Sequence, residues 1–216
     1  MFHKDYASYY NLFNQEKKYK KEIQFLYDWA EKPKSILDIG CGTASYWDFF
    51  PPEVLICGIE KSASMIENSA HKEKIFQLEA KNIRELDFVP DFDLATCLFD
   101  VVNYIEDHKW WKDIPVKPGG YFIMDIWDKE KVSKDGFRET TKTFGNASRK
   151  ISPLLIDGNS VLLEIEVNDS GKVFKENHKM FLYGKEDIER FCGDIFDIVE
   201  VKKTKDWQTF YKLRRK

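Results

Sequence analysis

The stretch Ser35-Ile36-Leu37-Asp38-Ile39-Gly40-Cys41-Gly42-Thr43-Ala44 reads as a short apolar strand that breaks into a glycine turn and then a helix. Glycine accepts the backbone angles of a tight turn and lets a ligand come close to the main chain. In the first strand–helix unit of a parallel sheet, such a turn is where a nucleotide lies. We therefore expect Gly40, Cys41 and Gly42 to contact a nucleotide-like ligand.

Two carboxylates narrow the choice of nucleotide. Asp38 lies two residues before the turn, where it would repel a pyrophosphate but suits a ligand that carries positive charge. Glu60 ends the next predicted strand, 18 residues past Gly42, where an acid accepts hydrogen bonds from ribose hydroxyls. The dinucleotide fingerprint also needs a third glycine, and this chain has Ser45 there. S-adenosylmethionine, which carries an ammonium and a sulfonium, therefore fits better than a nicotinamide dinucleotide.

The composition is that of a globular protein, with 43% hydrophobic and 33% charged residues among 216. The net charge of −3 disfavours a nucleic-acid partner, because such partners usually require a basic excess. Apolar runs are only as long as strands, so we expect no membrane segment. Met1 leads into polar and aromatic residues without a signal peptide, so we expect a cytoplasmic protein.

The four cysteines are Cys41, Cys57, Cys97 and Cys192. They form no CxxC pair and have no histidine at ligand spacing, so we expect no metal site and no disulfide framework. Three of them fall in or beside predicted strands, where a free cysteine behaves as a small buried apolar residue.

Strands and helices alternate around the glycine turn, which is typical of a parallel sheet with crossovers. Strands are predicted at 35–39, 54–59, 75–78, 92–98 and 120–126, and helices at 43–50, 62–71 and 101–111. Between 137 and 183, period-2 runs separated by glycine-containing turns predict about four antiparallel strands. A helix at 185–192 and strands at 195–201 and 207–213 complete the pattern.

We therefore expect a single α/β domain over 1–216. Its parts are an N-terminal helical cap at 1–33, a cofactor-binding core at 34–128, an inserted antiparallel β lobe at 129–184, and a final helix and strands at 185–216. The lobe interrupts the sheet before its last strands, so it is an insertion and not a separate domain.

Five segments, in the expected order and spacing, resemble the motifs of the class I S-adenosylmethionine-dependent methyltransferases. They are ILDIGCGTA at 36–44, GIEKSASMI at 58–66, AKNIREL at 80–86, DLATCLFDVVNYI at 93–105 and PVKPGGYFIMDIW at 115–127. The chain departs from the usual motifs at Ala44, where glycine is commonest, and at Lys81-Asn82-Ile83, where Gly-Asp usually precedes an apolar residue. The resemblance implies a Rossmann-like α/β fold, with a mostly parallel seven-stranded sheet and helices on both faces.

The resemblance also implies how S-adenosylmethionine is bound. Glu60 would hold the ribose, Met65 would pack near the adenine, and Asn82 would accept a hydrogen bond from the adenine amino group. Taken with the glycine turn, the expected cofactor-binding residues are Tyr10, Asp38, Gly40, Cys41, Gly42, Glu60, Lys61, Met65, Asn82, Ile83, Leu98 and Phe99.

The flanking segments resemble a narrower group, the bacterial enzymes that dimethylate amino groups of nucleotide-linked deoxysugars. Tyr10-Asn11-Leu12-Phe13 is similar to their N-terminal cap, in which an aromatic residue lies against the cofactor. Lys175-Glu176-Asn177-His178-Lys179 is similar to the Glu-x-His stretch that closes their inserted lobe.

Three residues are candidates for the chemistry. Tyr104 follows the fourth predicted strand below the expected methyl donor, where the amino-sugar enzymes have a histidine, and Asp100 shares its loop. His178 lies two residues from Glu176 on a predicted strand, so both face one side. We expect these groups to align the acceptor for in-line attack. Tyr104, Asp100 or His178 would take up the proton of an amine.

The sequence thus predicts methyl transfer from S-adenosylmethionine to a small-molecule acceptor, with an amine such as a nucleotide-linked amino sugar as the leading candidate. O-methylation of a small acceptor is the main alternative within the family. An RNA or protein methyltransferase, and a non-catalytic cofactor-binding protein, are alternatives from other classes. A basic face beside the glycine turn would favour an RNA or protein methyltransferase. Failure to bind S-adenosylmethionine would indicate a non-catalytic protein. The oligomeric state, a homodimer included, stays open.

Overall fold

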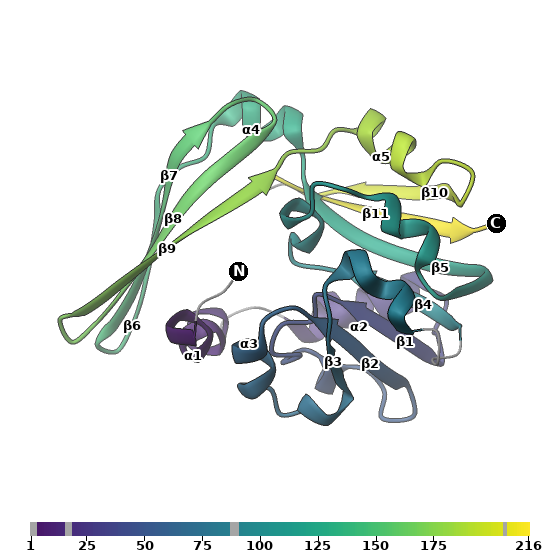
Figure 1. Ribbon diagram of the computed structural model, residues 1–216, viewed down its shortest axis with the longest axis horizontal. Helices are drawn as coiled ribbons and strands as arrows, with labels where there is room; N and C mark the ends of the chain where they lie inside the picture. Colours follow the sequence, from purple (N-terminus) through teal and green to yellow (C-terminus); the bar gives the residue numbers. More distant parts are fainter. Residues whose placement is uncertain (1–3, 16–18, 87–90, 205–206) are drawn as a thin grey trace.

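The computed structural model describes residues 4–15, 19–86, 91–204 and 207–216, and these residues form two sheets (Figure 1). The strands of the larger sheet are β1 Ser35–Ile39, β2 Leu55–Glu60, β3 Ile75–Gln77, β4 Phe92–Cys97, β5 Val116–Trp127, β10 Phe196–Lys203 and β11 Gln208–Arg215. The strands of the smaller sheet are β6 Thr140–Phe144, β7 Ala147–Ile156, β8 Ser160–Asp169 and β9 Lys172–Phe181. The described strands are ordered β10-β11-β5-β4-β1-β2-β3 in the larger sheet and β6-β7-β8-β9 in the smaller one.

The larger sheet is parallel except at β11, which runs against its neighbours β5 and β10. At its centre β1 lies between β2 and β4, and its Leu37 and Ile39 are fully buried. A parallel strand that is covered on both faces reads as a continuous apolar run, which made this strand predictable. The register brings Gly40, Glu60 and Leu98 to the carboxyl ends of three adjacent strands, so the loops that follow converge at one edge.

Helices α2 (Tyr19–Trp29) and α5 (Lys185–Cys192) pack on opposite faces of the larger sheet. Ile23 and Leu26 of α2 share a buried cluster with Ile36, whereas Ile188 of α5 shares another with Leu37. Ile36 and Leu37 are adjacent in β1 and therefore point to opposite faces. The remaining described helices are α1 Lys4–Asn14, α3 Ala63–Glu67 and α4 Lys129–Asp135, with the 3-10 helices η1 Trp47–Phe49, η2 Lys72–Lys74, η3 Ala80–Leu86, η4 Val101–Tyr104 and η5 Lys109–Asp113. None of the helices in the described ranges is long and apolar enough to cross a membrane.

The predicted crossover helices at 43–50 and 101–111 are wrong as α-helices, and the helix predicted at 62–71 is shorter. The first contains only the 3-10 helix η1, the second contains η4 and η5, and the third is reduced to α3. Ala44 adopts a left-handed backbone angle, with φ of +52°, that interrupts an α-helix, and Asp100, with φ of +66°, has such an angle just before η4. Apolar residues three apart suit either type of helix, so the sequence pattern did not distinguish the two.

The antiparallel strands predicted between 137 and 183 are confirmed as β6 to β9, which with α4 form a lobe between β5 and α5. Figure 1 shows the lobe standing away from the larger sheet. Along β8 the side chains alternate, and Val161, Leu163, Ile165 and Val167 are buried on one face. We call this the inner face of the lobe.

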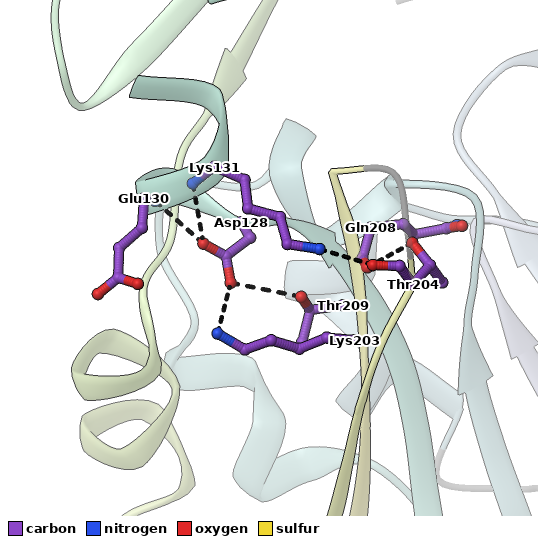
Figure 2. Close-up of polar contacts among 7 residues, drawn as sticks. All are labelled: Asp128, Glu130, Lys131, Lys203, Thr204, Gln208 and Thr209. Carbon is purple, nitrogen blue, oxygen red and sulfur yellow. Dashed lines mark hydrogen bonds and ion pairs between the residues drawn. The ribbon is translucent and has the colours of Figure 1, made fainter. Parts of the chain in front are cut away.

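A polar cluster fixes the base of the lobe to the larger sheet (Figure 2). Asp128 Oδ1 accepts hydrogen bonds from the backbone N–H groups of Glu130 and Lys131, at 3.0 and 3.3 Å, and so caps α4. Its Oδ2 accepts from the Thr209 hydroxyl at 3.3 Å and lies 3.6 Å from Lys203 Nζ. Because Lys203 and Thr209 belong to β10 and β11, the first turn of the lobe is held against the end of the core hairpin.

Helix α1 lies between the lobe and the core, where it contacts both β6 and α3 (Figure 1). The Tyr9 hydroxyl donates to Asp169 Oδ2 at 2.7 Å, which ties α1 to the turn between β8 and β9. The Thr43 hydroxyl donates to Asn11 Oδ1 at 2.6 Å, which ties α1 to the glycine turn. The helix therefore bridges the two halves of the molecule.

Candidate active site

A cavity of about 710 Å³ lies where the glycine turn, the lobe and α1 meet. Its walls come from the ends of β1, β2 and β4, from residues 78–81, from α1, and from the inner face of the lobe. Pockets that enclose small molecules and cofactors have volumes of roughly 300–1,000 Å³. The expected site residues that line it are Tyr10, Gly40, Cys41, Gly42, Glu60, Lys61, Met65, Leu98, Phe99, Asp100, Tyr104 and His178.

The glycine turn forms one end of the cavity. Gly40 and Gly42 have left-handed backbone angles, with φ of +72° and +59°. A Cβ on Gly40 would lie 2.4 Å from Val101 Cγ1, and one on Gly42 would lie 3.2 Å from Met65 Cε. Both backbone angle and space therefore favour glycine at these positions. Between them Cys41 is buried, and burial raises the pKa of its thiol well above the ordinary value, which keeps the thiol uncharged.

Glu60 ends β2 beside the glycine turn. Its Oε2 accepts the N–H of Gly42 at 2.9 Å, and its Oε1 accepts the N–H of Ser62 at 2.7 Å. Burial raises the pKa of this carboxyl, although the backbone hydrogen bonds oppose the shift. Each carboxylate oxygen has a second lone pair, so Glu60 can also accept hydrogen bonds from the hydroxyls of a ligand in the cavity.

Residues 78–81 form the wall where Asn82 and Ile83 were expected. Glu79 accepts from Lys61 Nζ and Lys81 Nζ, both at 2.8 Å, and these hydrogen bonds lower the pKa of its carboxyl. Asn82 and Ile83 do not line the cavity, and Ile83 instead packs in the core cluster under the sheet. The 3-10 turn of η3 therefore brings the residues just before the expected pair to the wall.

The carboxylate of Asp38 has a different setting from the one expected. It does not line the cavity and is only 1% exposed. It accepts hydrogen bonds from the Tyr46 hydroxyl, from Trp47 Nε1 at 2.7 Å and from Thr96 Oγ1 at 2.8 Å. Burial raises its pKa, and the three hydrogen bonds oppose that shift. Asp38 thus holds the segment after the glycine turn against β4 and does not face a cationic ligand directly.

The loop after β4 carries Leu98, Phe99 and Asp100 to the cavity. Phe99 and Asp100 both have left-handed backbone angles, with φ of +60° and +66°. Such angles in non-glycine residues cost about 1–3 kcal/mol each and persist where the surroundings enforce them. Here Asp125 of β5 enforces them, because its two carboxylate oxygens accept the N–H of Phe99 at 2.6 Å and of Asp100 at 3.1 Å. Burial raises the pKa of the Asp125 carboxyl.

Tyr104 of η4 and His178 of β9 are neighbours in the cavity wall. Their ring centroids are 5.7 Å apart in an edge-to-face arrangement. His178 Nε2 lies 2.8 Å from Glu176 Oε1, and both side chains are buried. A carboxylate beside Nε2 favours the tautomer with the proton on Nε2, which leaves Nδ1 as the basic nitrogen. Burial raises the pKa of Tyr104 far above its usual range, so its hydroxyl stays protonated.

Aromatic side chains close the cavity from the side of the N-terminal helices. Tyr6 and Tyr10 of α1, Tyr19 of α2, and Tyr46 all line it. Burial raises the pKa of each of these phenols, so they are neutral hydrogen-bonding groups. Of these four residues, only Tyr10 was among those expected to bind the cofactor, because helical spacing does not show which side of a cap meets the ligand.

Arg149 of β7 also lines the cavity and was not expected from the sequence. It is 9% exposed, and its Nη1 donates to the Tyr6 hydroxyl at 3.0 Å. In the alternating pattern of β7, Arg149 shares a face with Ala147 and Ile151. An arginine at an inward position of a half-buried strand is the signal that could have identified it.

Comparisons with known proteins agree with this geometry. No family model matches the chain. The dTDP-4-amino-2,3,4,6-tetradeoxy-D-glucose N,N-dimethyltransferase of Saccharopolyspora spinosa is 25% identical over 122 residues, which are 53% of this chain and 49% of that protein. The chain therefore spans about half the length of this curated relative.

Solved structures match over almost the whole chain. An S-adenosylmethionine-dependent methyltransferase from Clostridium acetobutylicum ATCC 824 has a TM-score of 0.78 and 22% identity, with 98% of each chain covered. CalS10, an amino pentose methyltransferase from Micromonospora echinaspora with S-adenosylmethionine bound, has a TM-score of 0.73 and 17% identity, with 100% of this chain and 98% of that chain covered. The chain thus has the class I methyltransferase fold.

Proposed function

We propose that this chain is an S-adenosylmethionine-dependent methyltransferase that methylates the amino group of a small molecule. The observation that carries the proposal is a single cavity with the glycine turn and Glu60 at one side and Tyr104 and His178 at another. The glycine turn and Glu60 suit a nucleoside. Tyr104 and His178 suit an acceptor that must lose a proton. The Saccharopolyspora spinosa relative is named as an amino-sugar N,N-dimethyltransferase and CalS10 as an amino pentose methyltransferase, which supports an amino sugar as the acceptor class.

The residues around the turn fit the cofactor. Gly42 leaves open the space beside Met65 that a side chain would fill, and Glu60 has lone pairs for the two ribose hydroxyls. When bound, S-adenosylmethionine would supply a methyl group on a positively charged sulfur, which an amine can attack. The aromatic side chains of α1 and the lobe would exclude water from that end of the cavity.

The chain's own groups would handle the acceptor's proton and orientation. His178 would accept the proton at Nδ1, because Glu176 holds the proton on Nε2. The neutral Tyr104 hydroxyl would orient the acceptor by hydrogen bonding, and Asp125 would keep Asp100 in place through its backbone N–H. Most of the rate would come from alignment of the reacting groups.

The cavity volume of about 710 Å³ suits a small acceptor better than RNA or protein, and we expect no nucleic-acid partner. We also propose that 1–33, 34–128, 129–184 and 185–216 act as one domain. Three of these parts line the cavity. The fourth supplies Gln208, whose Nε2 donates to Asp125 Oδ2 at 2.7 Å.

A product assay tests the proposed function. The chain would be incubated with S-adenosylmethionine and a dTDP-linked 4-amino-deoxysugar, and the sugar mass followed for the gain of one or two methyl groups. The matched control is the same sugar with a hydroxyl in place of the amine. Methylation of the amine alone is the expected result. Methylation of the hydroxyl sugar alone would instead indicate an O-methyltransferase, and no product from a chain that binds the cofactor would overturn the amino-sugar proposal.

A further inference from the structure

The lobe is joined to the larger sheet by two chain segments that lie side by side. The chain enters the lobe after β5, at Trp127 and Asp128, and leaves it after β9, from Phe181 to Tyr183. Asp128 and Tyr183 form a parallel bridge, and the N–H of Lys129 donates to the carbonyl of Tyr183 at 3.1 Å. The two segments thus form a short junction, and η4 contacts both of the strands that lead into it.

Asn103 of η4 holds both segments of this junction. Its side chain is fully buried. Its Nδ2 donates to the carbonyl of Phe181 at 2.6 Å, and its Oδ1 accepts the N–H of Trp127 at 2.9 Å. A side-chain amide carries a donor and an acceptor on neighbouring atoms, which is what a carbonyl and an N–H from two different strands require.

The two backbone groups lie where strand pairing gives out. Within the described part of the chain, β4 pairs with β5 no further than Met124, three residues before Trp127. Strand β9 is the last in its sheet, so in the described topology one of its edges has no strand beside it. A buried backbone group without a partner is costly, so nearly all such groups in proteins are paired. Asn103 supplies these partners in place of a strand.

The junction grips η4 on both sides of Tyr104. Asn103 precedes Tyr104 in the chain and donates to Phe181. Ile105 follows Tyr104, and its carbonyl accepts a hydrogen bond from the Tyr183 hydroxyl. Both bonds reach the same segment, the one by which the chain leaves the lobe. The position of Tyr104 is therefore tied to the lobe through its two neighbours.

This tie matters because Tyr104 and His178 come from different halves of the molecule. Tyr104 belongs to the core and His178 to the lobe, yet their rings are 5.7 Å apart in an edge-to-face arrangement. Phe181 lies three residues after His178 in the same strand, so the bond from Asn103 reaches the strand that carries His178. A shift of about 1 Å in a reacting group can cost about 100-fold in rate.

We propose that Asn103 is a positioning residue, which through its two backbone hydrogen bonds holds Tyr104 in place against His178 and so sets the geometry in which the acceptor's amine is bound. The proposal rests on the proposed function. Asn103 does not line the cavity, so it acts through Tyr104 and not by touching a ligand. Affinity for the cofactor is independent of it, because the glycine turn and Glu60 lie at the ends of other strands.

The test compares two variants with a control at the same base of the lobe. Asn103→Leu has a similar shape and removes both hydrogen bonds, and Tyr183→Phe is milder because it keeps the ring and removes only the hydroxyl. The control is Thr209→Val, which removes a buried hydrogen bond to Asp128 without touching η4. Steady-state rates are measured with an amino sugar that the wild type methylates.

We expect Asn103→Leu to lower kcat about tenfold or more and Tyr183→Phe to lower it less, because both misalign Tyr104. The KM for S-adenosylmethionine should stay within about twofold, because cofactor binding does not depend on this alignment, and the control should match the wild type. The proposal is overturned if Asn103→Leu keeps the kcat of the wild type, or if the control loses as much as Asn103→Leu.

A double variant separates positioning from a loss of stability. If Asn103 acts through Tyr104, then Asn103→Leu combined with Tyr104→Phe should turn over about as fast as the slower of the two single variants. Losses that multiply would show that Asn103 acts independently of Tyr104, and they would overturn the proposal.

A further measurement needs no turnover. In the wild type loaded with S-adenosylhomocysteine, NMR should show cross-relaxation between the ring protons of His178 and those of a labelled Tyr104, assigned by its loss in Tyr104→Phe. The signal should weaken in Tyr183→Phe and Asn103→Leu and persist in Thr209→Val. The proposal is overturned if the wild type gives no such signal, or if both variants keep it at full strength. If the wild type methylates no amine, the proposed function fails, and this signal still decides whether Asn103 positions the two rings.

Discussion

The hydroxyl of Thr43 in the glycine turn donates a hydrogen bond to Asn11 Oδ1 of α1 across a distance of 2.6 Å. Thr43 is buried and Asn11 is exposed, so the bond reaches from the bottom of the cavity to its cover. It joins the proposed cofactor-binding turn to the helix that carries Tyr6 and Tyr10. This side-chain contact therefore links the proposed binding turn to the helix that covers the cavity.

Replacing Thr43 with valine, which has nearly the same shape, should loosen α1. Loss of one hydrogen bond costs about 1 kcal/mol, so the backbone amides of α1 should exchange with deuterium roughly fivefold faster. Mass spectrometry of peptides from α1 measures this rate. Thr141→Val, at an exposed position of β6, is the control. Unchanged exchange in α1 would show that this contact does not hold the helix.

Gly40→Ala should destabilise the chain much more than Gly145→Ala. Both positions have positive φ, +72° and +57°, so both variants lose about 1–2 kcal/mol to backbone strain. At Gly40 the added Cβ also meets Val101 at 2.4 Å, whereas at Gly145 nothing lies within 4 Å. Overpacking adds about 1–3 kcal/mol. Urea unfolding measures the difference, and equal losses for the two variants would contradict the close packing of the turn.

His108 should make the fold sensitive to acid. It is packed against the rings of Tyr183 and Phe191, with centroids 4.8 and 4.2 Å away, and burial lowers its pKa to about 4. An unfolded histidine has a pKa of about 6.5, so between these values only the unfolded chain binds the proton. The stability from this residue is therefore complete above about pH 6.5 and is lost as the pH falls toward 4.

The difference between the two pKa values sets the loss in free energy of unfolding, which is about 3 kcal/mol or less. Urea unfolding of the wild type and of His108→Phe at a series of pH values measures it. The variant keeps an aromatic ring in place and should lose stability less steeply between pH 6.5 and 4. Parallel curves for the two proteins would show that His108 does not carry the dependence.

Tyr104→Phe should lower the turnover of an accepted amine by roughly tenfold or more, because the hydroxyl that orients the acceptor is removed. Affinity for S-adenosylhomocysteine should not change. Tyr27→Phe is the control, since Tyr27 lies on α2 and does not line the cavity. Steady-state rates with an amino sugar that the wild type methylates measure this effect. An unchanged rate for Tyr104→Phe would show that this residue has no part in the chemistry.

The strands were predictable because burial determines the order of apolar and polar residues along each of them. β1 reads as an unbroken apolar run, since a central parallel strand is covered on both faces. The strands of the lobe alternate, since one face is inward. The crossovers were not predictable in type. Ala44 and Asp100 have left-handed backbone angles, and the N–H of Asp100 is held by Asp125 of β5, which is distant in the sequence.

The lining of the cavity was predictable where a side chain lies at the end of a strand, as with Glu60 and the residues after β4. The lining was not predictable where tertiary contacts redirect a side chain. Asp38 lies near the carboxyl end of β1 as expected, yet Trp47 and Thr96 hold its carboxylate behind the turn. Arg149 lies in a strand whose inward face could be recognised only once α1 and the lobe were seen to meet.

Calorimetry with S-adenosylmethionine and S-adenosylhomocysteine tests the central claim most directly. We expect the wild-type chain to bind both ligands. Glu60→Ala should weaken binding about tenfold or more, the scale of a lost hydrogen bond to a charged acceptor, and Glu67→Ala, at an exposed position of α3, should change nothing. A folded wild-type chain that binds neither ligand would contradict the claim.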